Sequence, residues 1–122
     1  MSAANLAGHL QRFFTDRLLR QLGASPHTVA SYRDTFRLLL KFASEHHRRQ
    51  ASDLNVEDLD AKLLSSFLKH LEHERCNSIR SRNNRLSAIH AFFGQVCLHE
   101  PGLARHCQQV LAMRVPDMNT NS

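Results

Sequence analysis

A stripe of apolar residues at helical spacing runs through residues 79–96 and constrains the fold more than any other feature of the chain. The stripe consists of Ile79, Leu86, Ile89, Phe93 and Val96, at steps of seven, three, four and three residues. This spacing places all five side chains on one face of an α-helix. A helix of this kind must bury its apolar face, so the chain is expected to fold around a core to which this helix contributes.

The other face of the same segment is rich in arginine and asparagine. Its first turns carry Arg80, Ser81, Arg82, Asn84 and Arg85. No Asp or Glu occurs between Arg75 and His99, whereas ordinary exposed helices mix both signs of charge. Side chains of these types bind phosphates and base edges. The segment therefore favours a nucleic-acid-binding helix over the alternative of a merely solvated helix face.

The composition of the whole chain favours an all-α domain. The 122 residues suffice for one domain with one core, and 42% hydrophobic with 22% charged residues is ordinary globular composition. Four Gly and three Pro indicate long helices with few turns, and Leu is abundant while Val and Ile are scarce. The net charge of +5 is compatible with a polyanionic partner but is weak evidence by itself.

Capping residues and apolar periodicity predict the limits of the helices. Gly23 ends the first helix, Ser25 caps the second with Pro26 in its first turn, and Asp60 caps the third. Residues 55–59 form a short capped turn before that third helix. The predicted helices span about 5–22, 26–47, 61–74, 78–98 and 102–112.

One domain is expected over residues 1–113, followed by a polar, aperiodic tail or linker at residues 114–122. The chain has three Cys, an odd number, and no secretory signal pattern at its start. These features favour reduced thiols and a cytoplasmic location. No apolar run approaches the length of a membrane span.

Two longer motifs stand in order along the chain. Residues 25–43 read S-P-H-T-V-A-S-Y-R-D-T-F-R-L-L-L-K-F-A, and residues 77–93 read N-S-I-R-S-R-N-N-R-L-S-A-I-H-A-F-F. The first resembles the second helix of the N-terminal domain of tyrosine recombinases (phage integrases), and the second resembles the fourth helix of that domain. The resemblance extends over about residues 5–113 and implies a SAM-like core-binding domain. In the family, this bundle of four to five helices clamps DNA together with a separate catalytic domain.

The resemblance also implies which residues face DNA. They come from the second and fourth helices: His27, Thr28, Ala30, Ser31, Asp34, Arg80, Ser81, Asn84, Arg85 and Ser87. Arg82 stands where the family often has an apolar residue, so either its side chain snorkels outward or the start of the helix is rotated. The implied partner is double-stranded DNA, and the implied role is DNA binding in integration and recombination. Other recombinase protomers could contact the first helix or the tail.

The chain is not expected to be an enzyme by itself. Family members cleave DNA with a Tyr nucleophile assisted by Arg, Lys and His residues of the catalytic domain. Tyr32 is the only tyrosine here, and its position beside a core stripe predicts a packed side chain with a solvated hydroxyl. No Gly-rich phosphate loop, Ser-His-Asp arrangement or paired carboxylates occur, so no cofactor and no small-molecule substrate are expected.

A metal site is not expected either. His70, His73 and Cys76 recur at steps of three, but zinc needs a fourth ligand that the neighbouring sequence does not supply. Cys97 and Cys107 stand at apolar positions and are expected in the core. The alternative function is a small helical protein–protein interaction module that uses the same polar face to bind an acidic partner.

Overall fold

The computed structural model describes residues 5–21, 23–75 and 79–113, apart from the side chains of Leu19, Gln21, Glu74, Arg75, Ile79 and Arg80. The α-helices are α1 (Leu6–Arg12), α2 (Pro26–His47), α3 (Ala61–Arg75), α4 (Ile79–His99) and α5 (Ala104–Leu111). Shorter or irregular helical segments are η1 (Phe13–Gln21), η2 (Ala51–Asp53), η3 (Val56–Asp58) and η4 (Pro101–Leu103). The described residues contain no β-strand, and the predicted all-α fold is confirmed.

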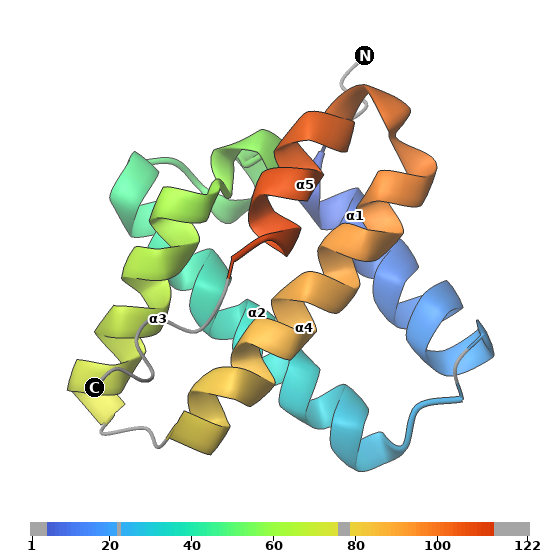
Figure 1. Cartoon of the computed structure of the whole chain (residues 1–122), viewed down its shortest axis with the longest axis horizontal. Coiled ribbons are helices and arrows are strands. Elements are labelled where there is room, and N and C mark those ends of the chain that lie inside the picture. Colours follow the sequence, from blue (N-terminus) through green and yellow to red (C-terminus); the bar gives the residue numbers. More distant parts are fainter. Residues whose placement is uncertain (1–4, 22, 76–78, 114–122) are drawn as a thin grey trace.

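Helix α4 is the central element of the bundle. It packs against α2, α3, α5 and η1, and Figure 1 shows it crossing in front of α2. Leu86, Ile89, Phe93 and Val96 of the predicted stripe are all buried. The ring of Phe92 packs against the ring of Phe13 in η1, with centroids 5.6 Å apart, and against the ring of Phe36 in α2, with centroids 5.3 Å apart. The helix that the sequence singled out therefore organises the core.

The predicted starts of α2 and α3 are confirmed by their hydrogen bonds. The hydroxyl of Ser25 accepts a hydrogen bond from the backbone N–H of Thr28 at 3.1 Å. A carboxylate oxygen of Asp60 accepts one from the N–H of Leu63 at 2.8 Å. These side chains satisfy backbone donors that a helix start leaves unpaired. Gly23 has φ +57°, in the left-handed region that favours glycine, and it precedes the turn into α2.

The first helix differs in kind from the continuous α-helix predicted over residues 5–22. After Arg12 the chain continues as a π-helix, η1. The wider π-helical turn places residues five apart on nearly the same face. Phe13 and Leu18 are five apart and both are buried, with exposed fractions of 0% and 2%. An α-helix would turn one of them away from the core, so packing accounts for the change of geometry.

None of the described helices is long and apolar enough to cross a membrane. The last predicted helix begins at Ala104, after the short turn η4, and ends at Leu111. The predicted tail, residues 114–122, lies outside the described residues.

Candidate nucleic-acid interface

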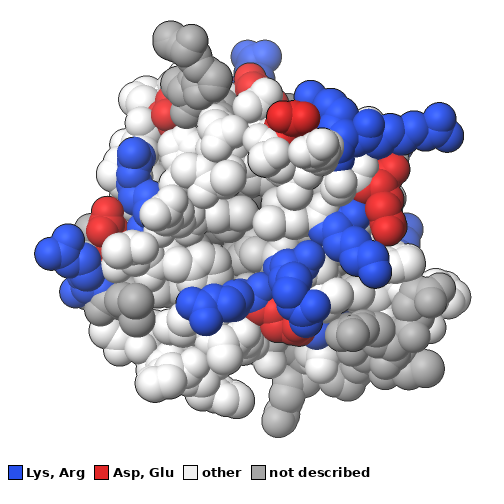
Figure 2. Space-filling view, turned by 180° about the vertical axis from the view of Figure 1, so that it is seen from behind, with Lys and Arg blue, Asp and Glu red and all other residues white. Residues whose placement is uncertain are grey.

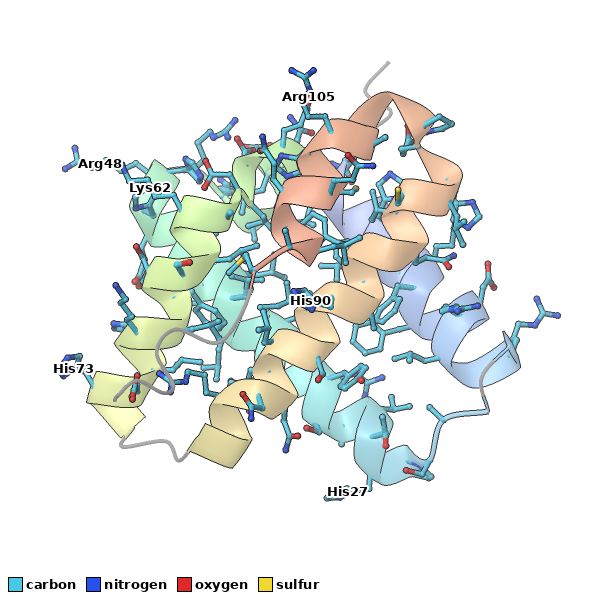
Figure 3. All side chains as sticks on the ribbon, in the orientation of Figure 1. His27, Arg48, Lys62, His73, His90 and Arg105 are labelled. Carbon is cyan, nitrogen blue, oxygen red and sulfur yellow. The ribbon has the colours of Figure 1, made fainter. Side chains whose placement is uncertain are left out.

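An open polar hollow of about 320 Å³ lies between the N-terminal part of α2 and the N-terminal half of α4. Its lining consists of His27, Thr28, Ser31, Tyr32, Asn84 and Ser87. Figure 3 shows His27 at the start of α2, pointing away from the bundle. Because every lining residue carries a hydrogen-bonding group, the hollow can bind a polar surface with several donors and acceptors.

Five of the ten residues that the resemblance implied as DNA-facing line this hollow. They are His27, Thr28, Ser31, Asn84 and Ser87. Ala30 is exposed on α2 but does not line the hollow, and Ser81 is half-buried in the first turn of α4. Arg80 belongs to α4, and its side chain lies outside the described part of the structure.

Two of the ten lie beside the hollow and contact each other. Arg85 is half-buried between α2 and α4, with 15% of its side chain exposed. Its Nη1 atom donates a hydrogen bond to the hydroxyl of Thr35 at 3.2 Å and lies 3.5 Å from a carboxylate oxygen of Asp34. The other carboxylate oxygen of Asp34 lies 2.6 Å from Nη2 of Arg37. One carboxylate is thus shared by two guanidinium groups.

The surroundings of Asp34 favour its charged form. Burial raises the pKa of its carboxyl group, but the hydrogen bond from Arg37 and the positive charges of Arg85 and Arg37 outweigh this effect. The net pKa therefore lies below the ordinary value of 3.8. At neutral pH the carboxylate offsets part of the positive charge of both arginines.

Arg82 faces α3 rather than the hollow. Only 8% of its side chain is exposed, and its Nη1 lies 2.6 Å from a carboxylate oxygen of Glu72. Arg82 therefore does not snorkel outward; it lies at the edge of the bundle, on the same face of α4 as the buried Leu86. The Nε atoms of Arg82 and Arg85 are buried, with no hydrogen-bond partner in the described part of the chain.

These ion pairs change the charge expected for the start of α4. The sequence has no acid between Arg75 and His99, but Asp34 and Glu72 approach α4 from other helices. Such pairing is not visible in a segment read by itself. The surface near the hollow consequently has fewer free cations than the local sequence indicates.

Exposed cations gather along another side of α2. Arg33, Arg37 and Lys41 are exposed and recur at steps of four, so they form a stripe on this helix. Figure 2, which views the molecule from behind, shows Lys and Arg side chains in a band across this face with a few acids among them. The guanidinium group of Arg33 lies 5.8 Å from the centre of the Phe14 ring. Arg33 is not among the residues that the family resemblance implies as DNA-facing.

Tyr32 is the lining residue that the sequence reasoning did not place at the interface. Its ring is half-buried and stacks on Phe13, with centroids 6.4 Å apart and planes 7° apart. The expectation of a packed tyrosine agrees with this position. The helical period predicts Tyr32 at the edge of the apolar face of α2. From this position its side chain contacts both the core and the hollow.

The described residues contain no cluster of three or more His, Cys, Asp or Glu that could hold a metal ion. Cys76, the third residue of the candidate set with His70 and His73, lies outside them. Cys107 is buried and Cys97 is half-buried, in agreement with the core positions expected for them. Burial and the neighbouring Cys97 raise the pKa of the Cys107 thiol from 9.0 to about 11.

Comparison with known proteins identifies the family. Residues 10–96 match the model of the phage integrase N-terminal SAM-like domain. Two curated proteins of Sinorhizobium fredii (strain NBRC 101917 / NGR234) are similar over 110 residues each, or 90% of this chain. "Putative integrase/recombinase y4rC" is 50% identical, and "Putative integrase/recombinase y4rD" is 41% identical.

The chain spans 33% and 39% of the lengths of these two relatives. No solved structure gives a significant match. The family model covers most of the chain, including all of α2 and α3 and most of α4. The chain therefore belongs to the phage integrase N-terminal SAM-like domain family.

Proposed function

We propose that this chain is the DNA-binding core-binding domain of a site-specific tyrosine recombinase, acting in DNA integration and recombination. It binds double-stranded DNA with α2 and α4. The family match and the names of the two relatives support this class of function. We assign strand cleavage to a separate catalytic domain, as the family resemblance implies. In this chain the only tyrosine, Tyr32, stacks its ring on Phe13.

The polar hollow is the observation that carries the proposal. It brings together residues from two helices that are more than fifty positions apart in the sequence, and none of the lining residues is aliphatic. The amide of Asn84 can donate to and accept from one adenine edge, while Ser31 and Ser87 can pair with any base. Uncharged side chains of this kind cannot neutralise phosphates, but they can donate hydrogen bonds to phosphate oxygens and bind base edges.

We assign attraction to the DNA backbone to exposed cations on another side of α2 and to the net charge of the chain. The exposed stripe of Arg33, Arg37 and Lys41 on α2 and the net charge of +5 supply it. Phosphate attraction of this type is independent of sequence. It weakens as the salt concentration rises, because counterions are then released into a more concentrated solution with a smaller gain in free energy. The domain alone should therefore bind duplex DNA weakly, with a Kd of roughly 10⁻⁴ to 10⁻⁶ M at physiological salt.

Fluorescence anisotropy with a labelled mixed-sequence duplex tests the proposal at several salt concentrations. We expect binding that weakens as salt rises and that weakens further in Asn84→Ala. Asn83→Ala is the matched control, because Asn83 is an exposed neighbour that does not line the hollow. The proposal fails if no salt-sensitive binding occurs up to about 10⁻³ M protein, well above the weakest expected Kd, or if the two alanine variants behave alike.

A further inference from the structure

A chain of hydrogen bonds connects α4 to the backbone of α2 directly behind the polar hollow. Nη1 of Arg85 donates to the hydroxyl of Thr35 at 3.2 Å. The hydroxyl of Thr35 in turn donates to the backbone carbonyl of Ser31 at 3.2 Å. Ser31 lines the hollow, and Arg85 is the sequence neighbour of Asn84, which lines it from the other side. The link therefore joins the two walls of the hollow.

The groups of this link are held inside the protein. Thr35 has an exposed fraction of 2%, and 15% of the Arg85 side chain is exposed. Asp34 supplies the opposing charge at 3.5 Å. If the guanidinium group of Arg85 turned toward a DNA phosphate, it would leave Thr35 and Asp34, and the carboxylate of Asp34 would keep only its contact with Arg37. Breaking such a partly buried pair is costly, and the exposed carboxylate would repel phosphate.

Other arginines near the hollow do not have this arrangement. Arg82 faces α3 through Glu72, and Arg37 is exposed on the outward side of α2. Among the described arginines, Arg85 is the one with hydrogen bonds that span α2 and α4. Its position thus fits a group that fixes the spacing of the two DNA-facing helices.

We propose that Arg85 is a positioning residue that holds α2 against α4 through Thr35 and Asp34, and so sets the shape in which the polar hollow meets DNA. This inference rests on the proposed DNA-binding function. It assigns sequence discrimination, rather than phosphate attraction, to Arg85. Thr35 does not touch DNA in this proposal. It determines specificity through its hydroxyl group, which is hydrogen-bonded to both Arg85 and Ser31.

A pair of substitutions at Thr35 tests the inference without a change of charge. Thr35→Val removes the hydroxyl at nearly constant volume, and Thr35→Ser keeps it. Each protein is incubated with a duplex library that has a randomised core, and the bound fraction is sequenced. We expect Thr35→Val to lower the enrichment of the best-bound sequences by about five- to tenfold, which is the effect expected from loss of one interaction between neighbouring residues. Binding of mixed-sequence duplex should be unchanged. Thr35→Ser should restore the enrichment.

Arg85→Gln supplies the second measurement. Loss of a phosphate contact reduces the slope of log Kobs against log salt concentration by about one. A positioning residue leaves that slope unchanged while the enrichment falls. The inference is overturned if Arg85→Gln reduces the slope by about one, or if Thr35→Val enriches the same sequences as strongly as the unsubstituted protein.

A measurement without DNA separates this inference from the proposed function. Backbone amide chemical shifts of Ser31, Asn84 and Ser87 should change in Thr35→Val and remain in place in Thr35→Ser. If the unsubstituted chain binds no duplex, the proposed function fails, and these shifts alone decide whether Arg85 and Thr35 set the shape of the hollow. Unchanged shifts in Thr35→Val overturn the inference.

Discussion

The Nη1 atom of Arg82 lies 2.6 Å from a carboxylate oxygen of Glu72, and this contact joins the first turn of α4 to the last turn of α3. Three residues further along α4, Arg85 contacts α2. The two arginines therefore hold the N-terminal half of α4 to two different neighbours. They fix the helix that carries Asn84 and Ser87 into the hollow.

Removal of the charge of Glu72 should destabilise the fold. In Glu72→Gln the largely buried guanidinium group of Arg82 loses its opposing charge. Because 44% of the Glu72 side chain is exposed, solvent replaces part of the interaction, and we expect a loss of about 1–2 kcal/mol in the free energy of unfolding. Urea denaturation measures this value.

The matched control for this variant is Glu57→Gln. Glu57 is an exposed acid of η3, and its neutralisation should change the free energy of unfolding by less than about 0.5 kcal/mol. Equal effects of the two substitutions would show that the contact between Arg82 and Glu72 contributes nothing specific.

Asp34 should make the fold sensitive to acid. The pKa of its carboxyl group is lowered in the folded chain, so its stabilising contribution is complete above the ordinary value of 3.8 and is lost as the pH falls through the lowered pKa. Asp34→Asn should therefore be less stable than the unsubstituted protein at about pH 7, and the difference should shrink at about pH 3. Urea denaturation at both pH values tests this, and a difference that stays constant would contradict it.

The cap of α2 should contribute measurably to stability. In Ser25→Ala the N–H of Thr28 loses its side-chain acceptor, and the typical cost is about 0.5–2 kcal/mol. Ser66→Ala is the control, because Ser66 is exposed within α3 and alanine is a better helix former. The Tm should fall in Ser25→Ala and should rise or stay unchanged in Ser66→Ala. A similar loss in both would argue against a capping effect.

The two described cysteines should differ in reactivity. Raising a thiol pKa from 9.0 to about 11 lowers its thiolate fraction near neutral pH by about a hundredfold, and Cys107 is also buried. When the Cys76→Ser protein is treated with iodoacetamide and the modified sites are mapped by mass spectrometry, Cys97 should be modified faster than Cys107. Urea should accelerate the reaction of Cys107, and rapid modification without urea would contradict its placement in the core.

The helices were largely predictable because their signals are local. Ser25 and Asp60 satisfy backbone donors three residues away, so their capping roles can be read from short segments. The stripe that includes Ile89 and Phe93 follows the period of an α-helix and is buried as that period predicts. The π-helical segment η1 was not predictable in this way, since its geometry depends on how Phe13 and Leu18 meet the rest of the core.

The roles of the arginines were harder to predict because their partners are distant in sequence. Arg82 pairs with a residue ten positions earlier, and Arg85 contacts residues fifty and fifty-one positions earlier. Local composition shows a basic helix and cannot show which cations are held inside the protein. The hydroxyl and amide groups of the hollow were implied by the family resemblance, and their shared hollow became visible only when α2 and α4 were placed together.

The π-helical segment also bears on how the length of the first helix can vary. Phe13 and Leu18 are five residues apart, and both fill the core through the wide turn between them. A chain with one residue fewer in this interval would place the same two side chains four apart, which is the spacing that a regular α-helix puts on one face. A single-residue deletion here would thus exchange one helical geometry for another and keep the same two anchors. The interval between Phe13 and Leu18 is therefore a point at which one residue can be lost while both side chains stay in the core.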